Sequence, residues 1–254
     1  MSLTDRIYTL VRQPLKRGAS VQRDGTDVSS QEAADLLKSH DTELGRLFFG
    51  HKGRIMQKWV HYLDLYDGYL SKYRGKPIRF LEIGVNRGGS LQLWREYFGP
   101  DALIYGIDVN PECAELFDPP TQVRIGSQAD PVFLRSVIAE MGAPDIIIDD
   151  GSHAAKHQQA SFEILFPLLA PGGIYVIEDM HTAYWRGEWE GGYKRRGTAV
   201  ELVKQLIDDM HGWWHRRSER MAPKEDLVAI HVHDSITFIE KGPREKPRHV
   251  RVAG

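Results

Sequence analysis

The chain has little cysteine, no long apolar run and almost no net charge. Its one cysteine, Cys113, excludes an internal disulfide framework. No apolar run approaches the roughly 20 residues that a membrane-spanning helix needs, and the N-terminus lacks the apolar core of a signal peptide. The formal net charge is only -2 at pH 7, which gives no overall reason to expect a nucleic acid. These absences predict a cytoplasmic protein that binds neither a membrane nor a nucleic acid.

The length of the chain, 254 residues of which 41% are hydrophobic, fits one large domain with a helical extension. Apolar residues at helical spacing, such as Leu63, Tyr66 and Leu70, precede the helix-breaking residues Gly75 and Pro77. We therefore expect residues 1–75 to form an N-terminal helical cap or extension and residues 76–254 to form the main domain.

Within residues 76–254, apolar runs alternate with helical patterns. We expect strands at 78–83, 103–107, 123–125, 145–149 and 174–177, helices at 90–97, 131–141, 154–169 and 198–210, and two final strands at 227–233 and 236–240. Such alternation is typical of an α/β protein with a mostly parallel sheet covered on both faces. The closing hairpin must pair antiparallel.

A glycine-rich turn follows the first strand and is a candidate cofactor site. It runs from Glu82 to Ser90, and Gly84 lets a ligand approach the backbone closely. The G-x-G-x-x-G pattern is not matched. Asp108, which ends the second strand, could accept hydrogen bonds from both ribose hydroxyls of an adenosine. This geometry suits a nicotinamide cofactor or S-adenosylmethionine. After the third strand, Ser127 and Gln128 could bind the adenine, although capping of the next helix explains this segment equally well.

Two further strands end in acids. Asp149 and Asp150 follow one, and Glu178 and Asp179 follow the other. Because neighbouring parallel strands lie about 4.8 Å apart, Asp150, Glu178 and Asp179 could share one cation. Three such acids would repel one another without a cation or protons. Carboxylate oxygens suit Mg²⁺, Mn²⁺ or Ca²⁺ rather than zinc. The alternative is ordinary helix capping and a solvated loop.

A histidine stands beside these acids. His153 lies at the start of the expected 154–169 helix, where the helix dipole favours a neutral imidazole that could act as a general base. The spacing of His153 and His157 also invites a zinc hypothesis. Ala154 stands where the H-E-x-x-H motif needs a glutamate, so His157 is better explained as a residue on the helix surface.

The combined motifs resemble the metal-dependent S-adenosylmethionine sugar O-methyltransferases of natural-product biosynthesis, which methylate rhamnose-type deoxysugars. The matching motifs are L-E-I-G-V from Leu81, G-G-S from Gly88, G-I-D from Gly106, D-D-G-S-H from Asp149, S-F-x-x-L-F-P-x-L-x-P-G-G from Ser161 and I-E-D from Ile177. The resemblance implies a class I methyltransferase (Rossmann-like) fold: a mostly parallel seven-stranded sheet with a C-terminal antiparallel hairpin.

The resemblance also implies specific roles for individual residues. Asp150, Glu178 and Asp179 would bind Mg²⁺ or Mn²⁺, and His153, with Asp150, would be catalytic. The S-adenosylmethionine side would comprise Tyr62, Glu82, Gly84, Ser90, Asp108, Ser127, Gln128 and Asp149. The H-Y-L-D-L-Y segment from His61 lacks the Thr and Pro of the family pattern H-Y-T-P-L-Y. The expected acceptor is a small sugar or glycosylated molecule of an antibiotic or other secondary metabolite, and we expect a homo-oligomer.

Other functions fit parts of the same pattern. A catechol or phenol O-methyltransferase would keep the fold and the metal. A nicotinamide oxidoreductase would keep the sheet, and a non-catalytic partner subunit would keep the fold alone. The glycine- and aromatic-rich segment from Tyr184 to Tyr193 could form a lid over an acceptor.

Overall fold

A single seven-stranded sheet forms the centre of the computed structural model, which describes residues 29–215 and 226–252. Its strand order is β3-β2-β1-β4-β5-β7-β6. The parallel strands are β1 (Arg79–Ile83), β2 (Leu103–Asp108), β3 (Gln122–Ile125), β4 (Ile146–Asp149) and β5 (Ile174–Ile177). The antiparallel strands are β6 (Leu227–Val232) and β7 (Thr237–Lys241). This arrangement confirms the expected parallel sheet with a closing hairpin.

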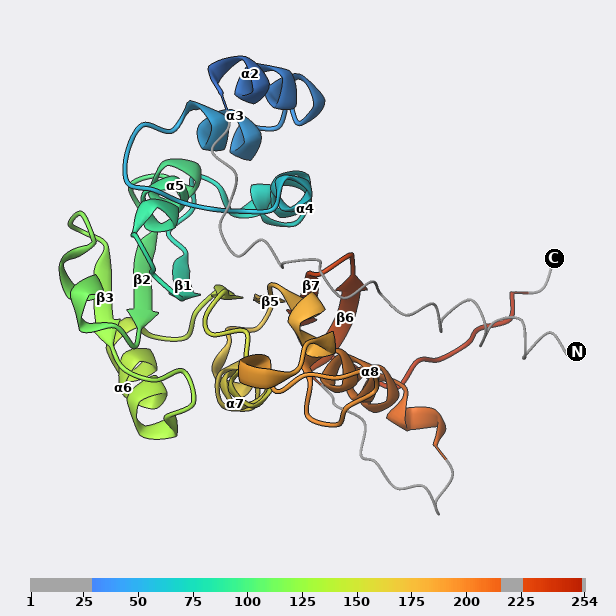
Figure 1. Cartoon of the computed structure of the whole chain (residues 1–254). Coiled ribbons are helices and arrows are strands. Elements are labelled where there is room, and N and C mark those ends of the chain that lie inside the picture. The colour runs from blue at the N-terminus through green and yellow to red at the C-terminus, as the bar shows by residue number, and fades with distance from the viewer. Residues whose placement is uncertain (1–28, 216–225, 253–254) are drawn as a thin grey trace, which may run out of the picture.

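Helices cover both faces of the sheet (Figure 1). On one face lie α3 (Glu43–Gly50), α4 (Val60–Leu70) and α5 (Gly89–Phe98), with α2 (Ser30–Ser39) outside them. On the other lie α6 (Pro131–Met141), α7 (Ala155–Leu165) and α8 (Ala199–Met210). Successive strand residues alternate between the two cores: Phe80 packs with α5, and Leu81 packs under α6 and α7. Burial on both faces explains the nearly continuous apolar strands.

The N-terminal helix α4 belongs to the same core as the sheet. Tyr62, Leu63, Tyr66 and Leu70 have no exposed surface and lie in one cluster with strand residues such as Phe80. The predicted division into 1–75 and 76–254 stays a prediction, but α4 buries its apolar face against the main domain. None of the helices within 29–215 and 226–252 is long and apolar enough to span a membrane.

Most expected elements form close to their predicted bounds, with two differences. The helix expected over 154–169 ends at Leu165 and is followed by a 3-10 turn, Phe166–Leu168. Pro167 lacks an N–H and its ring clashes with the preceding turn, which prevents an α-helix from continuing. The segment after β5, in which no helix or strand is expected, contains two short 3-10 helices, η4 (Met180–Tyr184) and η5 (Gly187–Trp189).

Candidate active site

The acids predicted at two strand ends meet at one edge of the sheet. Asp150 follows β4, and Glu178 and Asp179 follow β5. The two strands are parallel neighbours, with Asp149 paired to Ile177. The carboxyl ends of parallel strands form the crevice where open α/β sheets bind ligands.

Three side chains at this edge could hold one metal ion. Single ligand atoms of Asp150, His153 and Asp179 all lie within 4.8 Å of one another. His153 Nε2 is 3.8 Å from Asp150 Oδ1 and 3.7 Å from Asp179 Oδ2. The three side chains are 21–23% exposed, so solvent reaches them. Two carboxylate oxygens at this spacing fit a divalent ion such as Mg²⁺ or Mn²⁺, and the imidazole nitrogen beside them could either bind the ion or take a proton.

The backbone around the three side chains is unusual. His153 and Asp179 both have a left-handed conformation, with φ of 54° each. The hydroxyl of Thr182 donates a hydrogen bond to the carbonyl oxygen of His153 at 3.0 Å, which holds the two loops together. His153 Nδ1 is buried and has no hydrogen-bond partner among the residues that the structure describes.

Glu178 is turned away from the open triangle and contacts a buried lysine. Lys58 Nζ lies 2.5 Å from both Glu178 Oε1 and Asp150 Oδ2, and 3.9 Å from Glu82 Oε1. The Tyr66 hydroxyl also donates to Glu178 Oε1. Burial lowers the pKa of Lys58, but the negative charges of Asp150, Glu178 and Glu82 outweigh it and hold the pKa above its ordinary value. Lys58 is therefore an ammonium ion inside the acid cluster.

Sequence reasoning missed Lys58. It lies in the irregular segment between α3 and α4, among polar residues such as Gln57, and nothing in that pattern distinguishes it from a solvated lysine. Its side chain is only 2% exposed.

The other carboxylate oxygen of Asp179 is held by two aromatic side chains. Trp59 Nε1 donates to Asp179 Oδ1 at 3.0 Å, and the Tyr62 hydroxyl lies 3.0 Å from the same oxygen and 2.9 Å from the Ser235 carbonyl. Burial, and then Asp179, raise the pKa of Tyr62 well above its ordinary value, so the phenol keeps its proton. The structure thus places Tyr62 against the acid cluster, and Asp179 Oδ2 faces His153.

The glycine turn lies directly beside these acids. Gly84 has φ of +98°, and a Cβ on it would come within 2.1 Å of the Asp150 carbonyl oxygen, so only glycine fits. Asp108 Oδ2 accepts hydrogen bonds from the backbone N–H groups of Val85 (2.9 Å) and Asn86 (3.0 Å). The expected cofactor turn and the expected metal ligands therefore form one continuous site.

Glu82 is a buried acid below the turn. Ser90 Oγ donates to Glu82 Oε2 at 2.7 Å, and Trp94 Nε1 donates to Oε1 at 3.1 Å. Burial raises the pKa of Glu82 to about 7, against the lowering effect of Lys58.

Gln128 and Asp149 connect the loops that follow β3 and β4. Gln128 Nε2 donates to Asp149 Oδ1 at 3.0 Å, and Gln128 Oε1 accepts from the Ser152 N–H at 2.8 Å. Asp149 has no exposed surface and also contacts the Tyr175 hydroxyl at 3.1 Å. Ser127, which is half-buried, accepts from the Ala129 N–H at 3.2 Å. Of these side chains, Ser127 is the most accessible to a ligand.

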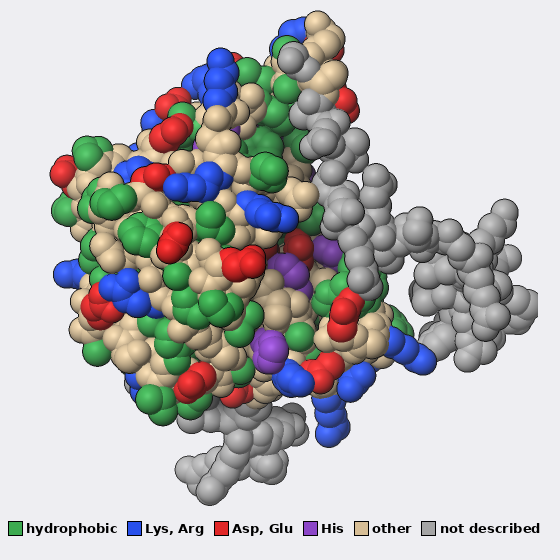
Figure 2. Space-filling view, turned by 60° about the vertical axis from the view of Figure 1, so that its left-hand side comes forward, with side chains coloured by type: hydrophobic (Ala, Val, Ile, Leu, Met, Phe, Trp, Pro, Cys, Tyr) green, Lys and Arg blue, Asp and Glu red, His purple; other side chains and the backbone are tan. Residues whose placement is uncertain are grey.

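An aromatic cluster borders the acids. The rings of Trp59 and His181 are 5.6 Å apart, those of His181 and Trp185 4.6 Å, and those of Trp185 and Trp189 5.1 Å. Trp59 is 52% exposed although its indole nitrogen binds Asp179. On the face drawn in Figure 2, histidine side chains gather around a recessed acidic side chain in a hollow of the surface.

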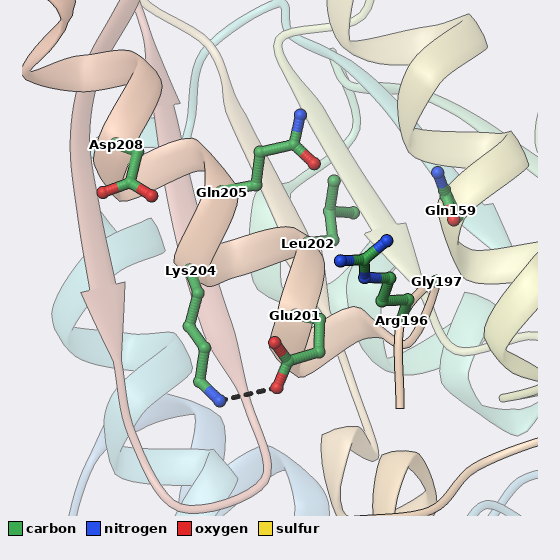
Figure 3. Close-up of a pocket in the computed structure, with 8 residues that line it drawn as sticks. All are labelled: Gln159, Arg196, Gly197, Glu201, Leu202, Lys204, Gln205 and Asp208. Atoms are coloured by element: carbon green, nitrogen blue, oxygen red, sulfur yellow. Dashed lines mark hydrogen bonds and ion pairs between the residues drawn. The ribbon is translucent and has the colours of Figure 1, made fainter. Parts of the chain in front are cut away.

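A second hollow, of about 440 Å³, lies between α7 and α8 (Figure 3). Its lining includes Gln159, Arg196 and Asp208, and an ion pair of 2.6 Å joins Lys204 to Glu201 at its rim. None of the candidate cofactor or metal residues lines it, so the acid cluster remains the candidate active site.

Comparison with known proteins identifies the central part of the chain. Residues 81–180, which include the glycine turn and all the strand-end acids, match the family model of a methyltransferase domain. The chain contains a methyltransferase domain. Together with the strand order, this match confirms the class I methyltransferase fold.

Curated relatives extend the similarity beyond the domain. The chain is 38% identical over 231 residues to 8-demethyl-8-(2-methoxy-alpha-L-rhamnosyl)-tetracenomycin-C 3'-O-methyltransferase of Streptomyces olivaceus, covering 84% of the chain and 58% of that protein. It is 40% identical over 191 residues to demethylmacrocin O-methyltransferase of Streptomyces fradiae, covering 70% and 47%. The chain thus spans about half the length of the curated relatives it matches.

A solved structure is also similar to this chain. It is the MycE methyltransferase from the mycinamycin biosynthetic pathway in complex with Mg, SAH and mycinamycin VI. The two chains share 32% sequence identity with a TM-score of 0.68, over 83% of this chain and 53% of the other.

Proposed function

We propose that the chain is an O-methyltransferase that moves a methyl group from S-adenosylmethionine to a hydroxyl of a rhamnose-type deoxysugar in an antibiotic or other secondary metabolite, with Mg²⁺ or Mn²⁺ as cofactor. The observation that carries the proposal is the convergence of Asp150, His153 and Asp179 beside the Gly84 turn. Relatives with rhamnosyl and macrolide acceptors in their names support the sugar class.

The cofactor would lie over the Gly84 turn with its ribose near Asp108. The carboxylate of Asp108 is already oriented by backbone N–H groups, and it is partly exposed. Val109, beside it, is 72% exposed and offers an apolar surface to a base. Ser127 follows β3, the strand that pairs with β2 at Asp108. Behind this surface, Glu82, Ser90, Gln128 and Asp149 fix the loops on which the cofactor would rest. A direct role of Tyr62 toward the cofactor stays a prediction.

Asp150 and Asp179 would bind the metal, joined by Glu178 as the motif implies. When bound, the metal supplies Lewis acidity that makes a sugar hydroxyl easier to deprotonate. Asp179 is oriented before the metal binds, because Trp59 and Tyr62 hold one of its oxygens and leave the other facing the site.

His153 would act as the general base, and its Nε2 would then stand beside the metal rather than bind it. Its Nε2 faces the acids, so the neutral tautomer that can act as a base there is the one with the Nε2 lone pair free and the proton on Nδ1. Nε2 then takes the proton of the sugar hydroxyl as the oxygen attacks the methyl carbon. The O–CH₃ bond forms while the bond between the methyl group and the sulfonium breaks, and S-adenosylhomocysteine leaves. General base catalysis of this kind typically contributes a factor of about 10² to 10⁴.

The acceptor would lie against the aromatic cluster of Trp59, Trp185 and Trp189. Aromatic rings offer large apolar faces to a sugar or a flat aglycone, and Trp59 connects this surface directly to Asp179. The lid role of the segment from Tyr184 to Tyr193, the cytoplasmic location, the homo-oligomeric state and the absence of nucleic-acid and membrane partners remain predictions.

The decisive experiment combines binding and transfer. Calorimetry should show binding of S-adenosylhomocysteine and no binding of NAD⁺. Transfer of a labelled methyl group should then be followed to a rhamnosyl glycoside and to a catechol, each with Mg²⁺ or with EDTA. We expect Mg²⁺-dependent methylation of the glycoside. Methylation of the catechol alone would assign the alternative phenol chemistry, and failure to bind S-adenosylhomocysteine would overturn the cofactor assignment.

A further inference from the structure

The two oxygens of Asp150 face two different positions. Oδ1 faces His153 and the open triangle, whereas Oδ2 lies 2.5 Å from the Lys58 ammonium. The same ammonium lies 2.5 Å from Glu178 Oε1. Lys58 therefore lies between Glu178, which is only 2% exposed, and Asp150, which is partly exposed.

The backbone around Lys58 is fixed against the methyltransferase domain. In the segment 51–59, the Arg54 guanidinium forms hydrogen bonds of 2.7 and 3.0 Å with Asp118, and the Arg54 N–H donates to Gln92 Oε1 at 2.8 Å. On the other side of Lys58, Trp59 donates to Asp179. Anchors on both sides direct the lysine inward, so its position is built into the fold.

We propose that Lys58 is a built-in counter-ion that competes with the divalent metal: its ammonium holds the position between Asp150 and Glu178 and must move away before Glu178 can bind a metal. This inference rests on the proposed function, which supplies the metal. It accounts for how three acids implied as metal ligands are packed together, because the Lys58 ammonium compensates part of their charge.

The competition has a direction that can be measured. An ammonium that must be displaced, and that repels an incoming cation, weakens metal binding. Replacing it with a neutral side chain of similar length removes both effects. A lysine that only supported the fold would act in the opposite direction, since its loss would disorder the ligands and weaken metal binding.

The test is titration of MnCl₂ into EDTA-treated protein by calorimetry, with the full chain and the variant Lys58→Met. We expect Lys58→Met to bind Mn²⁺ at least tenfold more tightly than the unchanged protein, and MgCl₂ to raise its melting temperature more. Lys58→Gln, whose amide can still donate to a carboxylate, is the second variant should Lys58→Met fail to fold. The matched control is Lys52→Met, an exposed lysine of the same segment, which should leave the Mn²⁺ affinity unchanged.

The outcomes separate this inference from the proposed function. If the unchanged protein binds Mn²⁺ and a folded Lys58 variant binds it equally or more weakly, the role of Lys58 is overturned and the metal site stands. If neither binds Mn²⁺, the metal in the proposed function fails, and the competition fails with it.

Discussion

Glu82 should make the protein less stable as the pH rises toward neutrality. Its carboxyl group is fully buried, and burial raises its pKa from 4.5 to about 7. Between these two values the folded state holds a proton that the unfolded state has lost. Because stability rises with pH only where the unfolded state binds more protons, the contribution of Glu82 must run in the opposite direction.

The size of the effect follows from the pKa values. A rise in the pKa from 4.5 to about 7 makes the folded state about 3 kcal/mol less stable above both values than below them, at about 1.4 kcal/mol for each pKa unit. The stability is fully present below about pH 4.5 and is lost as the pH rises through about 7. Between pH 5 and pH 8, Glu82 should therefore lower the free energy of unfolding by about 2–3 kcal/mol.

The assay is urea unfolding of metal-free protein at several pH values between 5 and 8, with Glu82→Gln as the variant. Glutamine has the same shape and can accept one of the bonds from Ser90 or Trp94, but it has no proton to lose. The unchanged protein should lose about 2–3 kcal/mol more than Glu82→Gln over this range. A difference between the two proteins that stays constant with pH would refute the reasoning.

Three more changes test other parts of the structure. His153→Gln should lower methyl transfer about 10²- to 10⁴-fold while S-adenosylhomocysteine still binds, and His157→Gln should retain activity; equal losses would contradict the role of His153. Gly84→Ala should abolish calorimetric binding of S-adenosylhomocysteine, because its Cβ would lie 2.1 Å from the Asp150 carbonyl oxygen; normal binding would refute the fit of the turn. Asp130→Ala should lower the free energy of urea unfolding by about 1 kcal/mol, because Asp130 accepts from two N–H groups of α6, whereas Asp130→Asn should lose much less.

Local signals in the sequence predict the fold well. The start of α6 at residue 131 is as expected, because Asp130 is the N-cap and Pro131 the first helical residue, both of which are typical of helix starts. The acids at 149–150 and 178–179 were predicted to lie close together because they follow apolar runs, and β4 and β5 pair as neighbours. Each of these features depends on residues near one another in the sequence and on one rule of sheet geometry.

Contacts between distant segments could not be predicted in the same way. Lys58 meets Asp150 and Glu178 across more than 90 positions of the chain, and no local pattern signals a buried lysine. Tyr62 was expected near the cofactor, and its contact with Asp179 arises from how α4 packs on the sheet. A chain cut at the predicted boundary after residue 75 would lose both side chains, so the predicted extension and the candidate site are structurally inseparable.

The left-handed backbone at His153 and Asp179 has a consequence for engineering the protein. A side chain in this conformation costs about 1–2 kcal/mol that glycine does not incur. A library of variants selected for heat resistance alone would therefore enrich glycine in place of His153, whereas Asp179 would be retained for its hydrogen bonds with Trp59 and Tyr62. Directed evolution toward thermostability must include a screen for methyl transfer, or the most heat-resistant variants will be those that have lost the proposed general base.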